Sequence, residues 1–231
     1  QTAPWPRSAW MVRLDAKTLS RQRAGLANSE TKEEARPREM SRVVANLTAT
    51  SGQLEIVYDL VSVDASDRVL DVGCGPGVLS AQLTTQAGHV TGVDFSAAMI
   101  AEAQRLHPGI DFQVANAEEL PFEDGSFDVA VVNYCAHHLA RPDKAFGEIR
   151  RVLRPDGRLA VVHPIQALQP SWGSFAEAVA AVLPPETVPG GALLDAAQPK
   201  VYVDLLLECG YRDAHCEARQ KPVSITSLDV L

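Results

Sequence analysis

The stretch DVGCGPG, residues 71–77, decides the fold of this chain. It directly follows the strand-like segment 68–72 and opens a segment with helical periodicity, so its three glycines lie in a strand-to-helix turn. Glycine permits backbone angles and a close approach that a side chain would block. The stretch therefore predicts an α/β domain with a ligand site at the carboxyl end of its first strand.

The spacing of the glycines separates two kinds of ligand. Dinucleotide-binding loops have the pattern G-x-G-x-x-G, whereas this loop has G-x-G-x-G with Pro76 inside it. A pyrophosphate is bound by backbone N–H donors, and proline has none. S-adenosylmethionine carries no phosphate, and its ammonium and sulfonium suit backbone carbonyls and the Asp71 carboxylate. The loop favours this ligand over NAD, with a plain tight turn as the alternative.

Outward from the loop, strand-like and helix-like segments alternate along the chain. We expect strands near 68–72, 90–94, 110–114, 127–132 and 158–163, and helices near 52–63, 77–87, 96–107 and 142–153. Residues 154–157, Arg-Pro-Asp-Gly, read as a turn between a helix and a strand. The alternation predicts the α/β fold class, with a doubly wound, mostly parallel sheet.

The flanking parts of the chain lack this regular pattern. Residues 1–45 are polar and predict an N-terminal helical arm or lid, ahead of a single domain over 46–231. Prolines and glycines break the pattern in 164–198, which reads as an insertion after the fifth strand and as a possible acceptor-side cover. A helix near 199–209 and a strand near 212–219 follow.

Composition narrows the class of partner. The chain has 231 residues and a formal net charge of -8 without a Lys/Arg run, which argues against nucleic acid as the principal partner. No apolar stretch has the length of a membrane span, and no apolar signal core is present, so we expect a cytoplasmic protein. The four cysteines show no C-x-x-C pairing, so neither zinc nor a disulfide framework is expected.

Polar side chains follow the second and third strands. Asp94 ends the second strand, where its carboxylate can accept both ribose hydroxyls; the alternative is that it caps the next helix, a role that Ser96 can also take. Asn116 follows the third strand and offers a donor and an acceptor to an adenine edge. Its alternative role is an Asx turn.

Four segments together resemble the class I S-adenosylmethionine-dependent methyltransferases, which have a Rossmann-like methyltransferase fold. These segments are Val69–Gly77, Val90–Ser96, Asn116–Asp128 and Glu148–Val162. The stretch from Glu119 to Asp128 resembles the branch that contains the ubiquinone and menaquinone C-methyltransferases. The family's seventh strand has no convincing candidate near the end of the chain, so we expect an incomplete C-terminus.

The resemblance implies S-adenosylmethionine as cofactor, with S-adenosylhomocysteine as product, and it implies the residues that bind it. These are Asp71, Gly73, Cys74, Gly75 and Gly77 at the methionine end, with Asn133 close by, Asp94 at the ribose, Phe95 and Met99 at the adenine face, and Asn116, Ala117 and Glu118 at the adenine edge. For Met99 core packing is the simpler role. The family more often has aspartate where Asn116 stands.

Four side chains at the ends of strands four and five are candidates to face the methyl acceptor: Tyr134, His137, His138 and His163. His138 is the candidate catalytic base, since histidine accepts protons near neutral pH. A structural role is the alternative for each of them. We expect no metal site at the histidines, since no carboxylate or thiolate stands at ligand spacing.

The sequence therefore predicts an enzyme that transfers a methyl group to a small-molecule acceptor by in-line displacement, at oxygen, nitrogen or carbon. Two alternatives stay open. One is a non-catalytic S-adenosylmethionine-binding partner or regulatory subunit, and the other is a macromolecular methyltransferase. The sequence does not determine the oligomeric state.

Overall fold

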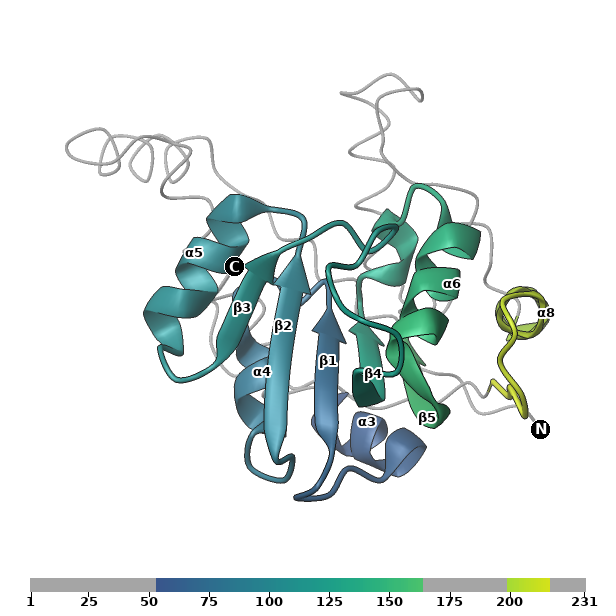
Figure 1. Ribbon diagram of the computed structural model, residues 1–231, viewed down its shortest axis with the longest axis horizontal. Coiled ribbons are helices and arrows are strands. Elements are labelled where there is room, and N and C mark those ends of the chain that lie inside the picture. The colour runs from purple at the N-terminus through teal and green to yellow at the C-terminus, as the bar shows by residue number, and fades with distance from the viewer. Residues whose placement is uncertain (1–52, 164–198, 217–231) are drawn as a thin grey trace, which may run out of the picture. The chain divides into compact units, whose positions relative to one another are not determined.

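A computed structural model describes residues 53–163 and 199–216 of the chain. Five strands form one sheet in the order β3-β2-β1-β4-β5, and every neighbouring pair is parallel. The strands are β1 (Arg68–Val72), β2 (His89–Asp94), β3 (Asp111–Val114), β4 (Phe127–Asn133) and β5 (Leu153–Val162). Their carboxyl ends meet at one edge, at the top of Figure 1. The predicted doubly wound parallel sheet is confirmed.

Helices cover both faces of this sheet. They are α3 (Gln53–Val61), α4 (Val78–Leu83), α5 (Ala97–Leu106), α6 (Pro142–Val152) and α8 (Pro199–Glu208), with a short 3-10 turn, η2 (Ala136–His138). The α3 and α4 helices pack on one face through a buried cluster that contains Val57, Leu83 and Val131. In the part that the structure describes, no helix combines the length and apolarity needed to cross a membrane.

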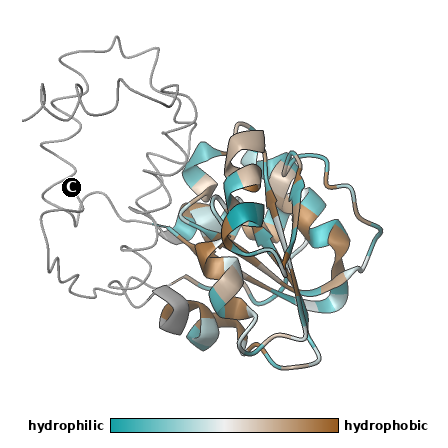
Figure 2. Ribbon diagram, turned by 90° about the vertical axis from the view of Figure 1, so that its left-hand side faces the viewer, coloured by the Kyte–Doolittle hydropathy of each residue, from teal (hydrophilic) through white to brown (hydrophobic). Residues whose placement is uncertain are grey.

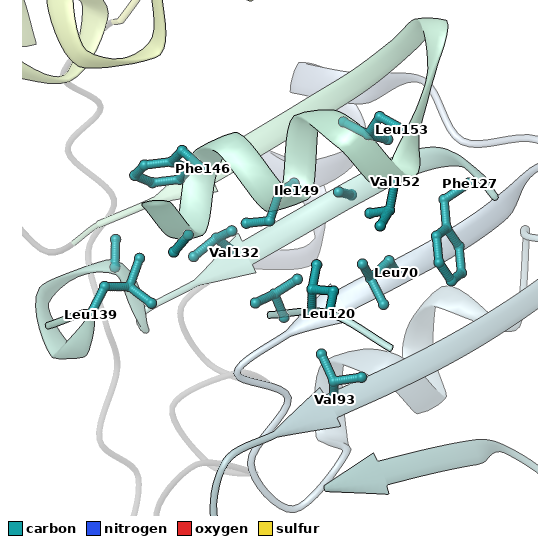
Figure 3. Packing of buried hydrophobic residues seen from close by; sticks show 14 of the residues in the cluster. Leu70, Val93, Leu120, Phe127, Val132, Leu139, Phe146, Ile149, Val152 and Leu153 are labelled. Carbon is teal, nitrogen blue, oxygen red and sulfur yellow. The ribbon is translucent and has the colours of Figure 1, made fainter. Parts of the chain in front are cut away.

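The opposite face of the sheet carries the larger buried cluster, between β1, β4 and α6. Apolar residues of α6 recur at helical spacing, so Ile149 and Val152 point from one side of the helix toward Val132 and Leu70 of the strands (Figure 3). Figure 2 shows the result, with apolar strands inside and hydrophilic residues on the outer sides of the helices. Burial of this kind is the main stabilising contribution to the domain.

Three boundaries differ from the prediction. The α4 helix ends at Leu83 rather than near 87. The hydroxyls of Thr84 and Thr85 donate to backbone carbonyls of the preceding turn, and the amides of Thr85 and Gln86 donate to carbonyls three residues earlier rather than four. The β5 strand already begins at Leu153. Residues 154–157, predicted as a turn, lie within it as an irregular stretch, since Phe127 pairs with Leu153 while Val129 pairs with Arg158.

The strand predicted near 212–219 is wrong for the residues that the structure describes. Residues 211–216 are irregular, and Asp213 has a φ of 57°, which an extended strand does not allow. Gly210, also left-handed with a φ of 87°, ends α8 as predicted. The predictions for the arm over 1–45, for the segment 164–198 and for a missing seventh strand lie outside the described residues.

Candidate cofactor and acceptor site

The candidate site lies where the strand order reverses, beside β1. The chain runs outward through β2 and β3 on one side of β1 and returns to β4 and β5 on the other (Figure 1). Loops that follow neighbouring strands meet there: the amides of Gly73 and Cys74 donate to the Val93 carbonyl at 2.8 and 3.0 Å, and the Ala115 amide donates to the Asp94 carbonyl at 3.0 Å. In open α/β sheets this edge is where ligands bind.

Two glycines of the loop are closely packed against other side chains, and the third lies beside open space. A Cβ on Gly73 would lie 2.1 Å from the sulfur of Cys135, and one on Gly77 would lie 2.5 Å from the Phe112 ring. A Cβ on Gly75, whose φ is 52°, would meet nothing within 4 Å. Close packing therefore requires glycine at 73 and 77, and among these three only Gly75 lies beside open space that a ligand can fill.

Asp94 joins the glycine loop to the start of α5. Its Oδ2 accepts a hydrogen bond from the Gly75 amide and its Oδ1 one from the Ser96 amide, both at 2.9 Å. The capping role belongs to Ser96, whose hydroxyl accepts a hydrogen bond from the Met99 amide. Each oxygen of Asp94 keeps a further lone pair, so the carboxylate can also accept from a ligand.

Asp71 is a buried carboxyl group directly under the loop. It is 1% exposed, and its Oδ2 accepts a hydrogen bond from the Ser80 hydroxyl at 2.6 Å. Burial raises the pKa of Asp71 to about 6, and repulsion from the Asp94 carboxylate acts in the same direction. A cationic ligand group close to the loop would favour the charged form of this carboxyl.

The two cysteines of the site are not activated thiols. Burial raises the pKa of Cys74 strongly and that of Cys135 to about 12, and the carboxylates of Asp71 and Asp94 add to both shifts. A thiol with a raised pKa is a poor nucleophile. Cys74 packs instead in a small cluster with Phe112 and α5, while its backbone contributes to the loop.

The loop after β3 has the Asx turn that the sequence left as the alternative for Asn116. The side-chain oxygen of Asn116 accepts a hydrogen bond from the Glu118 amide at 3.0 Å. The Ala117 side chain packs against the larger buried cluster between β1, β4 and α6, while Asn116 itself is exposed. The carboxylate of Glu118 accepts three hydrogen bonds from Arg141, and the assignment of Glu118 to the cofactor stays a prediction.

Phe95 lies at the same edge with 83% of its side chain exposed, which leaves its ring available to a flat ligand. Met99 is half-buried one turn into α5. Val114, at the end of β3, is 53% exposed on the neighbouring strand. No sequence pattern identified Val114 as an exposed residue at this edge, because a valine at a strand end is more often part of the core.

On the other side of β1, rings from three segments meet. The His137 ring centroid lies 4.0 Å from the His138 ring centroid and 5.3 Å from the His163 ring centroid. The His163 ring centroid lies 5.4 Å from the ring centroid of Tyr202 in α8. Burial lowers the pKa of His137 to about 4, helped by the two neighbouring histidines, so this imidazole is neutral near pH 7. His138 is exposed.

Tyr134 and Asn133 connect these rings to β4. Asn133 is the last residue of that strand, and Tyr134 follows it with a φ of 54°, an uncommon conformation for a residue other than glycine. The Tyr134 amide donates to the Val162 carbonyl at 2.8 Å, which holds the ends of β4 and β5 together. Within 53–163 and 199–216, no three His, Cys, Asp or Glu side chains form a group that could hold a metal ion.

A network that sequence reasoning missed holds the stretch after the Asn116 turn against α6. The Arg151 guanidinium donates to the carbonyls of Leu120 and Phe122 at 3.0 and 2.8 Å, and to the carboxylates of Glu148 and Asp124 at 2.8 Å. The hydrogen bonds from Arg151 lower the pKa of Glu148. The spacing of Glu148 and Arg151, three apart on one helix, was the available signal.

Comparisons with known proteins agree with this geometry. A family model described as a methyltransferase domain matches residues 70–161. The chain is 32% identical over 162 residues to the demethylmenaquinone methyltransferase of Renibacterium salmoninarum, covering 70% of this chain and 67% of that one. It is 35% identical over 142 residues to an O-methyltransferase of Aspergillus sclerotiorum, covering 58% and 48% of the two chains.

The fold is also similar to that of a chain in the Haloferax volcanii complex of the Trm112 methyltransferase activator. The TM-score is 0.58 at 19% identity, with 79% of this chain and 77% of that chain covered. The chain spans about half the length of most of the curated relatives that it matches.

Proposed function

We propose a methyl-transfer activity for this chain, which belongs to the S-adenosylmethionine-dependent methyltransferase family. The proposal depends on the environment of Gly75, which lies beside open space while its amide donates a hydrogen bond to the Asp94 carboxylate. Pro76 next to it has no N–H to offer a phosphate. The loop therefore suits a cofactor that brings positive charge and ribose hydroxyls rather than a pyrophosphate.

The residues present fit S-adenosylmethionine, the cofactor of this family. Asp94 would accept from the ribose hydroxyls, Asp71 and the glycine loop would hold the methionine end, and Phe95 would cover the adenine. Asn133 would lie near the methionine end, with Met99, Asn116 and Ala117 at the adenine. When bound, the cofactor supplies a methyl group on a cationic sulfur, which an acceptor atom displaces in line.

We infer a small molecule as the acceptor. The support is the relative named for demethylmenaquinone, a small molecule, together with the ring cluster at the ends of β4 and β5. Half-buried His137 offers an uncharged ring there, and His163 packs between this ring and the buried ring of Tyr202. The role of the chain is then to position the acceptor and to exclude water.

Binding and product formation test the proposal together. Calorimetry should show that the protein binds S-adenosylhomocysteine and not NAD. Incubation with S-adenosylmethionine and a panel of small phenols, naphthols, carboxylic acids and amines should give a product heavier by one methyl group. Tight NAD binding without S-adenosylhomocysteine binding would end the proposal. Cofactor binding without any methylated product would favour a non-catalytic binding protein.

We also propose His138 as the base that takes the acceptor proton. Its exposed imidazole lies in η2, just after β4, beside neutral His137. His138→Asn should lower turnover of the methylated panel compound by about 10²–10⁴-fold, with nearly unchanged S-adenosylhomocysteine affinity. Full activity in folded His138→Asn and His138→Ala would leave positioning alone as the mechanism.

A further inference from the structure

An ion pair between Glu118 and Arg141 joins two segments that are 23 residues apart in sequence. The Arg141 Nε and Nη2 donate to Oε2 of Glu118 at 2.9 and 2.7 Å, and the Arg141 backbone amide donates to Oε1 at 3.1 Å. Both oxygens of the carboxylate are therefore engaged by one residue. The Glu118 side chain is 11% exposed, whereas that of Arg141 is 61% exposed.

The backbone part of this contact takes the place of a helix cap. Arg141 stands at the N-cap of α6, where its own side chain makes no capping bond. In a capping box, a glutamate three residues into the helix accepts from the N-cap amide. Here Glu118 of a distant loop accepts that bond, and its negative charge lies at the positive end of an eleven-residue helix.

Each partner is tied to a different half of the candidate site. The Glu118 amide donates to the Asn116 side chain, so Glu118 is part of the turn at the proposed adenine edge. Arg141 lies three residues after His138, and the intervening Leu139 is buried in the main core. The ion pair thus links the adenine-edge loop to the turn that carries the candidate base.

A second ion pair provides a useful contrast. Arg105 donates to both oxygens of Glu102 at 2.7 Å, and the two side chains are 54% and 6% exposed, close to the values for Arg141 and Glu118. Both residues of that pair lie three apart on α5, so it links no separate segments. Loss of either arginine removes a charged hydrogen-bond donor from a largely buried carboxylate.

We propose that Arg141 is a positioning residue that, through Glu118, sets the adenine-edge loop and couples it to the turn carrying His137 and His138. This inference rests on the proposed function, because it assigns the loop at residues 116–118 to the cofactor. Arg141 touches neither reactant in this account. Its effect on the cofactor is exerted through the carboxylate of Glu118.

The first test compares Arg141→Met with Arg105→Met. S-adenosylhomocysteine and adenosine affinities are measured by calorimetry, well below the unfolding midpoint of each variant. Arg141→Met should weaken the binding of both ligands about tenfold, which corresponds to about 1.4 kcal/mol, and Arg105→Met should leave both within about twofold of wild type. Arg141→Lys and Glu118→Gln give the same comparison where Arg141→Met does not fold.

The second test follows amide hydrogen exchange on addition of S-adenosylhomocysteine. In wild type, exchange should slow both at Gly75 and at His138, whose amide donates to the Cys135 carbonyl at 2.8 Å. In Arg141→Met at saturating ligand, the slowing should persist at Gly75 and disappear at His138. Equal slowing at His138 in both proteins would overturn the coupling.

The outcomes separate this inference from the function on which it rests. Wild-type affinity in Arg141→Met, or an equal loss in Arg105→Met, would overturn the positioning role and leave the proposed function standing. A wild-type protein that binds no S-adenosylhomocysteine would overturn the proposed function and this inference with it.

Discussion

Asp94 has a structural role at this site, and it is also the residue that we propose to bind the ribose. Its two oxygens already accept the amides of Gly75 and Ser96, so the carboxylate fixes the shape of the glycine loop before any ligand arrives. The sequence presented ribose binding and helix capping as alternatives. The structure gives the capping bond to Ser96, and ribose binding stays a prediction for Asp94.

Asp94→Ala should weaken S-adenosylhomocysteine binding by about 1.5–3 kcal/mol, the range for hydrogen bonds to a charged group. Ser96→Ala is the matched control, because it removes the α5 cap and should cost about 1 kcal/mol of folding stability without a comparable loss of affinity. Calorimetry and urea unfolding measure the two quantities. Unchanged binding in a folded Asp94→Ala protein would restrict Asp94 to its structural role.

At the scale of elements, α6 organises the stretch that precedes β4. Arg151 is half-buried and uses its guanidinium to join Leu120, Phe122 and Asp124 to the helix, while Glu148 of the same helix accepts the Leu120 amide at 3.0 Å. A charged group with this many partners differs from an isolated surface ion pair, whose contribution is small. The network fixes the chain between β3 and β4.

Arg151→Ala should lower the free energy of unfolding by about 2–3 kcal/mol, because it removes several charged hydrogen bonds and leaves the carbonyls of Leu120 and Phe122 without this donor. The neighbouring Arg150 is the control. Its guanidinium donates to three backbone carbonyls, those of Leu153, Arg154 and Pro155, at 3.2–3.3 Å, and two of these bonds are exposed to solvent. Arg150→Ala should cost under about 1 kcal/mol. Equal losses in urea unfolding would contradict this account.

Elements with local signals were predicted well. The α6 helix was expected over 142–153 and runs from Pro142 to Val152, because proline suits a first helical turn and apolar residues recur at helical spacing. The start of β5 was missed. The Arg150 side chain holds the carbonyls of 153–155, and pairing with β4 incorporates residues that locally resemble a turn.

For the molecule as a whole, the strand order brings the candidate residues together. Asp71, Asp94 and Asn133 lie at the carboxyl ends of three neighbouring strands, as the alternating pattern predicts. Contacts between distant segments were not predictable, such as Glu118 with Arg141 or His163 with Tyr202. No spacing rule identifies partners that only the completed fold brings within reach.

The free energy of unfolding is a property of the whole molecule, and Asp71 makes it depend on pH. The folded pKa of about 6 lies above the ordinary aspartate pKa of 3.8, so the buried carboxyl stabilises the fold fully below pH 3.8, and this contribution is lost as the pH rises through about 6. The loss amounts to as much as about 3 kcal/mol for a shift of this size.

Asp71→Asn should remove that dependence. The stability of the variant relative to wild type, measured without cofactor by thermal unfolding, should increase between pH 4 and pH 7.5. A flat difference for Asp71→Asn would mean that this carboxyl is not perturbed by burial.

The open space at Gly75 has a genetic consequence. Every glycine codon becomes an alanine codon by a single base change, and at Gly73 the added methyl group would collide with Cys135 and disturb folding. At Gly75 the added methyl group would meet no atom of the described part of the chain within 4 Å, and its cost to folding would be limited to about 1–2 kcal/mol for a left-handed alanine. The methyl group would instead occupy the space that we propose for the cofactor. We therefore expect that one nucleotide change at codon 75 yields a folded protein with impaired cofactor binding.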